Sequence, residues 1–102
     1  MESRVEETVL SFQGRISVDN SSEMRDRLGA ALKAGLKELT VDLSQVTSID
    51  ISGLATLVEA NRIARQQGTQ LVIAGMQGQV ELLFGITRLD RILGPAPDRQ
   101  PI

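Results

Sequence analysis

Stretches with β-strand character alternate along this chain with stretches of helical periodicity, and this alternation is what most limits its fold. Strand-type stretches lie at residues 5–16, 39–43 and 70–75, with helix-type stretches between them. Helical stretches of about 10 to 15 residues between strands are typical of crossover connections within one sheet. The order predicts an α/β fold, with a small mixed β-sheet flanked by helices.

The strand-type stretches differ in their patterns. Residues 5–10 and 11–16 carry apolar side chains at loosely alternating positions, so they form either a hairpin or one bent strand. Residues 39–43 alternate with a period of two, and residues 44–48 are small and polar, which indicates a loop. The nearly continuous apolar run at 70–75 predicts a central strand covered on both faces.

A first helix is predicted from about Ser21. Asn20 and Glu23 have the spacing of a capping box, in which each side chain bonds the backbone amide of the other residue. Gly35 then supplies a left-handed stop. The apolar residues recur on one helical face: Met24, Leu28, Ala31 and Leu32.

Two further helices are predicted in the second half of the chain. The pattern becomes helical from Gly53, and the helix ends near Gln67 because Gly68 is a typical stop residue. Residues 77–85 predict a brief third helix. Residues 86–93 fit either a fourth short helix or a final edge element.

Length and composition limit the organisation and the partners. A chain of 102 residues has room for one domain, which we assign to residues 1–93. Residues 94–102 contain three prolines and are expected to form a disordered tail. A net charge of -2 and only two aromatic residues argue against direct binding of nucleic acid. Without a signal peptide or a long apolar run, we expect a cytoplasmic protein with no membrane insertion.

The absence of Cys and His removes several classes of chemistry. Disulfides, thiolate nucleophiles, Ser-His triads and the common zinc sites all need one of these residues. Asp42 and Asp50 do not make a paired catalytic constellation with other groups, and the loop from Gly75 to Gly78 lacks the lysine of a phosphate-binding loop. We therefore expect no enzyme activity, catalytic residue, cofactor or metal.

The junction between residues 39–43 and the second helix is the most informative segment. Ser52 lies next to the first helical turn, where free backbone amides and the helix dipole favour a negative group such as a phosphate. Gly53 leaves the Ser52 hydroxyl accessible. The residues alone leave simpler alternatives open: Ser52 as a loop or capping serine, Asp50 as a helix cap and Gly53 as a turn residue.

Most of the chain, from about residue 5 to residue 93, resembles the STAS domain family and especially the bacterial anti-sigma factor antagonists. The specific part is Val-Asp-Leu-Ser at residues 41–44, followed by Asp-x-Ser-Gly-Leu at residues 50–54. Further similarity covers residues 14–16, 45–49, 68–75 and 83–93.

This resemblance implies a partner-switching cycle. The unphosphorylated antagonist binds an anti-sigma factor that is itself a serine kinase, and so frees a sigma factor. Phosphorylation at the position matching Ser52 ends this binding, and a PP2C-type phosphatase restores it. The partner-binding residues expected here are Ser17, Asn20, Ser48, Asp50, Ser52, Gly53 and Leu54.

Two positions depart from the family pattern. Ser17 stands where the family often has an acidic residue, which leaves the partner or its contacts open. Ile51 stands where the family often has a second serine, so Ser52 is the phosphorylation candidate, with Ser48 a lesser one. The alternative function is a STAS assembly subunit of a lipid-transport or stress-signalling complex that has no phosphoswitch.

Overall fold

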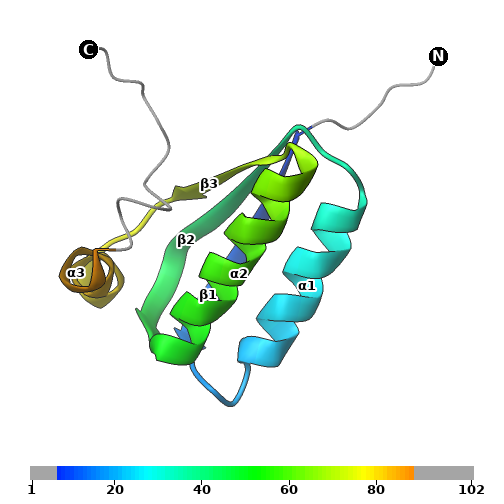
Figure 1. The fold of residues 1–102 in the computed structure, drawn as a ribbon. Coiled ribbons are helices and arrows are strands. Elements are labelled where there is room, and N and C mark those ends of the chain that lie inside the picture. Colours follow the sequence, from blue (N-terminus) through cyan, green and yellow to red (C-terminus); the bar gives the residue numbers. More distant parts are fainter. Residues whose placement is uncertain (1–6, 89–102) are drawn as a thin grey trace, which may run out of the picture.

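The structure is a computed structural model that describes residues 7–88. Three strands alternate with three helices along these residues (Figure 1). The elements are β1 (Glu7–Ile16), α1 (Ser21–Lys33), β2 (Glu38–Ile49), α2 (Ile51–Gln67), β3 (Gln70–Ala74) and α3 (Gly78–Thr87).

The strands form one sheet in the order β1-β2-β3. The α/β class is confirmed, but the expected mixture of strand directions is not found within residues 7–88, where both strand pairs are parallel. The physical reason is that each connection between strands is a helical crossover. The prediction of β3 as the central strand is also wrong for the described sheet. Its apolar run reflects burial of both faces, which an edge strand can also have.

Helices α1 and α2 pack against each other along one face of the sheet, and α3 lies apart from them and packs on β2 (Figure 1). Their apolar faces enclose one core with the inward side chains of the strands. The largest fully buried side chains in this core are Leu28, Leu39, Val41, Leu43, Val46, Ile49, Leu54, Leu57, Ile73, Val80 and Phe84.

Several boundaries differ from the prediction. The first two strand stretches form one strand, β1, which was one of the two alternatives. The expected loop at 44–48 belongs to β2, whose pairing with β1 tolerates these residues through two shifts of register. Helix α3 runs on to Thr87. The remaining expectations for residues 89–93 and for the tail at 94–102 lie outside the described residues.

Candidate functional site

Asp50 connects the end of β2 to the start of α2. It is the N-cap of α2, and its side chain accepts hydrogen bonds from the backbone amides of Ser52 and Gly53 at 2.9 and 3.2 Å. These amides belong to the first turn, where the Asp50 side chain supplies the acceptor, and the Gly53 amide also donates to the carbonyl of Asp50 at 3.1 Å. The alternative that Asp50 is a helix cap is therefore confirmed.

The second oxygen of Asp50 reaches the loop between β1 and α1. Its Oδ2 accepts a hydrogen bond from the backbone amide of Val18 at 3.2 Å. The backbone amide of Asp50 also donates to the carbonyl of Ile16 at 3.0 Å. One aspartate thus joins the start of α2 to the end of β1 and to the following loop.

Ser52 lies half-buried in the first turn of α2. Its hydroxyl donates a hydrogen bond of 2.6 Å to Oδ1 of Asp50, and its carbonyl accepts one from the hydroxyl of Thr56 at 2.9 Å. Oδ1 of Asp50 consequently receives three donors from Ser52 and Gly53 together. The serine hydroxyl lies at the positive end of the helix dipole, beside a carboxylate.

The surroundings of Asp50 favour its charged form. The hydrogen bond from the Ser52 hydroxyl is the main reason that the pKa of Asp50 lies below its usual value. Partial loss of water raises this pKa, whereas the backbone amides of Gly53, Val18 and Ser52 lower it further. Asp50 is therefore a carboxylate at neutral pH.

Ser17 and Asn20 shape the loop between β1 and α1. The Asn20 side chain accepts from the amide of Ser17 at 2.9 Å and donates to the carbonyl of Arg15 at 2.8 Å. The Ser17 hydroxyl accepts from the amide of Asp19 at 3.2 Å. The capping box predicted for α1 is wrong, because the Asn20 side chain closes this loop and makes no cap hydrogen bond.

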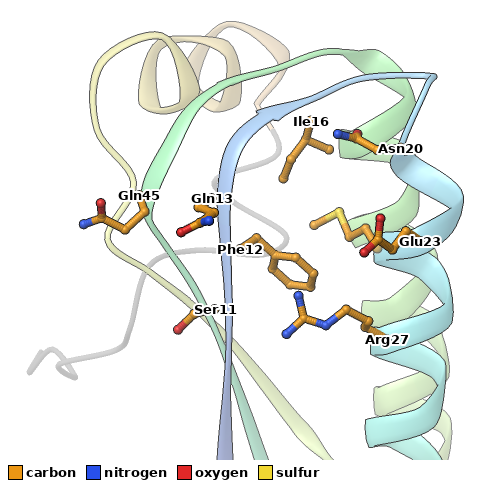
Figure 2. A pocket seen from close by; sticks show the side chains of 9 residues that line it. Ser11, Phe12, Gln13, Ile16, Asn20, Glu23, Arg27 and Gln45 are labelled. Atoms are coloured by element: carbon orange, nitrogen blue, oxygen red, sulfur yellow. The ribbon is translucent and has the colours of Figure 1, made fainter.

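A hollow of about 420 Å³ lies between β1 and α1, next to Asn20 (Figure 2). The guanidinium of Arg27 lies over the ring of Phe12, 4.5 Å from its centroid. Ser11 and Gln13 project from β1 away from this ring (Figure 2). The hollow thus adjoins the loop at Asn20, but Asp50 and Ser52 are not among its lining residues.

Gly53 and Leu54 serve the packing of α2. A Cβ atom on Gly53 would lie 2.6 Å from Cγ1 of Ile49 and 2.8 Å from Cγ2 of Ile16. Glycine is therefore required for the close approach of α2 to both strands. Leu54 is only 2% exposed and belongs to the core, so its side chain is not on the surface of this conformation.

Ser48 is separated from this hydrogen-bonded group. It lies in β2 opposite Arg15. None of the hydrogen bonds of the Asp50 group, which consists of Asp50, Val18, Ser52 and Gly53, includes Ser48. Asp42 is also remote from Asp50, because eight residues of strand correspond to roughly 25 Å. Its carboxylate accepts from the amide of Ser44 at 2.9 Å, which is the main reason that the pKa of Asp42 is lowered.

Sequence reasoning missed three residues around the site. Val18 is 73% exposed and lies in the loop that is bonded to Asp50. Ile51 is 64% exposed and stands between Asp50 and Ser52 in the sequence. Gln79 in α3 binds the backbone of Ile49, immediately before Asp50. Exposure and long-range contacts leave no local pattern in the sequence. Only the apolar character of Ile51 beside Ser52 could have indicated an exposed apolar side chain at the site.

The described part of the chain holds no group of three or more acidic residues arranged to bind a metal. Across the same residues, no helix has the length and apolar character that crossing a membrane requires.

A family profile described as "Mlab, STAS domain" matches residues 1–94, which includes the whole of the described fold and the Asp50 group. The chain belongs to the STAS domain family. The STAS segment of this chain is also 31% identical over 83 residues to sulfate transporter 3.2 of Arabidopsis thaliana. The match covers 71% of this chain and 13% of the transporter, so the chain corresponds to a small part of that relative.

Solved structures of anti-sigma factor antagonists share this fold. An anti-sigma factor antagonist from Mycobacterium paratuberculosis superposes with a TM-score of 0.82 at 20% identity, over 94% of this chain and 81% of that one. The anti-sigma factor antagonist SpoIIAA in its unphosphorylated form gives a TM-score of 0.66 at 13% identity, over 92% and 96% of the two chains. At these identities the likeness establishes the fold alone.

Proposed function

We propose that this STAS protein is an anti-sigma factor antagonist switched by phosphorylation of Ser52. Its unphosphorylated form binds an anti-sigma factor that is a serine kinase, and a sigma factor is thereby freed. The kinase transfers the γ-phosphoryl group of ATP to Oγ of Ser52, with loss of the hydroxyl proton and release of ADP. A PP2C-type phosphatase hydrolyses the ester and returns the hydroxyl and inorganic phosphate.

The hydrogen bond from Ser52 to Asp50 is the observation on which this proposal depends. A phosphoryl group on Oγ removes the hydroxyl donor and adds about -1.5 to -2 charges beside a carboxylate. The phosphate and Asp50 then repel each other and compete for the same amides of the first turn. Repulsion and the cost of removing water from this charge oppose burial of the site under a partner.

Two exposed apolar side chains supply a contact surface beside the switch. Val18 and Ile51 lie in the two segments that Asp50 connects. Isolated apolar residues on a surface are ordinary, but Ile51 directly precedes the phosphorylation candidate, and the amide of Val18 binds Asp50, the hydrogen-bond partner of Ser52. We assign the contact surface to Val18, Ile51, Ser52 and Asp50, with Ser17 and Asn20 holding the adjacent loop. Ser48, Gly53 and Leu54 are not assigned to it, because Ser48 lies outside the group and the other two are buried.

A second candidate is an assembly module without a phosphoswitch, as in a lipid-transport or stress-signalling complex. The match to a segment of a sulfate transporter favours this candidate, because it pairs this chain with one part of a much larger protein. In that role Ser52 would only complete the cap of α2.

Incubation with ATP and the anti-sigma factor kinase encoded nearest to the gene distinguishes the two. Intact-mass and peptide mass spectrometry should find one phosphate, on Ser52. It should be absent from Ser52→Ala and present in Ser48→Ala, the matched serine control on β2. Phosphate on another residue, or none on the wild type, would contradict the switch and favour the assembly module.

A further inference from the structure

Strand β2 extends well beyond its partner β3. Their pairing ends at Asp42 and Ala74, so the part of β2 from Leu43 to Ile49 has no strand on that side within the described sheet. Two glutamines at the start of α3 bind this edge. The side-chain nitrogen of Gln77 donates to the carbonyl of Ser44 at 2.7 Å.

Gln79 binds both backbone groups of Ile49. Its Oε1 accepts from the amide at 2.9 Å, and its Nε2 donates to the carbonyl at 3.2 Å. A primary amide offers the same donor and acceptor as a peptide group, so Gln79 takes the place of a neighbouring strand at this residue.

The junction between β2 and α2 is therefore held from two sides. Gln79 of α3 fixes Ile49, and the carbonyl of Ile16 in β1 fixes the amide of the next residue, Asp50. The direction of the Asp50 side chain depends on this backbone, because Asp50 must reach Ser52 and Val18 at once.

We propose that Gln79 is a positioning residue for the Ser52 site. Its side-chain hydrogen bonds go to Ile49, and through Ile49 it keeps Asp50 in the geometry that receives the serine hydroxyl. Its effect on partner binding rests on the proposed function, whereas its effect on Asp50 does not.

The simpler alternative is that Gln79 only attaches α3 to the sheet. Gln77 provides the matched control, because it starts from the same end of α3 and also binds β2. Its partner is Ser44, far along the strand from Asp50. A purely structural role predicts similar effects of the two glutamines, whereas a positioning role predicts an effect of Gln79 alone on the site.

The test compares Gln79→Met with Gln77→Met, which keep the side-chain length and lose the amide. NMR titration follows the Asp50 carboxyl and the amides of Ser52 and Gly53, and needs no partner. In Gln79→Met the pKa of Asp50 should move toward its ordinary value and both amide resonances should shift, while Gln77→Met resembles the wild type. Equal behaviour of the two variants would overturn the positioning role.

Binding to the kinase used above tests the consequence for the partner. Loss of the Gln79 amide should weaken binding about three- to tenfold, and loss of the Gln77 amide should leave it unchanged. Unchanged binding by Gln79→Met would overturn the effect on the partner. A wild type that neither binds nor is phosphorylated would reject the proposed function, and the Asp50 titration would still decide the role of Gln79.

Discussion

The hydroxyl of Ser52 donates a hydrogen bond to the carboxylate of Asp50 across 2.6 Å, within the first turn of α2. The same carboxylate accepts from the amide of Val18 in the loop after β1. A change at Ser52 therefore acts directly on Asp50, the residue that joins this loop to α2.

Replacing Asp50 by Ala should destabilise the fold by about 1–2 kcal/mol, because α2 loses its N-cap. Asp50→Asn should cost less, since asparagine is also a good N-cap. Urea unfolding measures both changes. Asp26→Ala, at an exposed position of α1, is the control and should lie within about 0.5 kcal/mol of the wild type. An equal loss in Asp50→Ala and Asp26→Ala would refute the role of the cap.

Replacing Ser52 by Ala should raise the pKa of Asp50 toward its ordinary value, because the hydroxyl is the main cause that lowers it. A lowered pKa in the folded state contributes stability above about pH 4 that is lost as the pH falls through the folded value. This pH-dependent contribution to the free energy of unfolding should be smaller in Ser52→Ala than in the wild type.

Carboxyl NMR titration checks this change, together with unfolding between acidic and neutral pH. Glu59 in the same helix is an internal control, since Arg62 lowers its pKa independently of Ser52. An Asp50 titration identical in both proteins would show that the hydrogen bond is unimportant in solution.

Gly53→Ala should destabilise the protein by about 1–3 kcal/mol, because its Cβ would overlap the side chains of Ile49 and Ile16. Gly29→Ala in α1 is the matched control. Apart from the adjacent backbone of α1, nothing lies within 4 Å of the added Cβ atom, and alanine favours helix, so Gly29→Ala should stabilise the protein by about 0.4–1 kcal/mol. Thermal or urea unfolding measures this difference in sign, and a stabilised Gly53→Ala would disprove the close packing.

Val18→Ser and Ile51→Ser should weaken kinase binding while leaving the unfolding free energy within about 0.5 kcal/mol. Both side chains are exposed, so the core does not depend on them. Val9→Ser replaces a comparably exposed residue on β1 and should leave binding unchanged. Isothermal titration calorimetry gives the affinities. If Val9→Ser has as large an effect as the other two, the contact surface is wrongly assigned.

Local patterns were sufficient for much of the fold. The stop at Gly68 was predicted because glycine readily adopts a positive φ, and its φ is 84°. The capping box at Asn20 failed because its side chain closes a loop to Arg15 instead. The loop predicted from the small polar residues at 44–48 was wrong, because shifts of strand register accommodate these residues within β2.

The candidate site could be predicted only in part. Asp50 and Ser52 are close in sequence at a helix start, and the resemblance to the STAS family at residues 50–54 identified them as site candidates. The contacts of Val18 and Gln79 span 32 and 30 residues of chain, and such pairs have no signature in a single sequence. The burial of Leu54 likewise depends on how α2 packs on the sheet.

The proposed switch requires the kinase to have different affinities for the same preparation before and after stoichiometric phosphorylation of Ser52, and both affinities can be measured by isothermal titration calorimetry. Gln66→Glu is the control for an added negative charge, because it lies at the other end of α2. We expect at least about tenfold weaker binding after phosphorylation, and no change for Gln66→Glu. Equal affinity of the two forms would contradict the proposed switch.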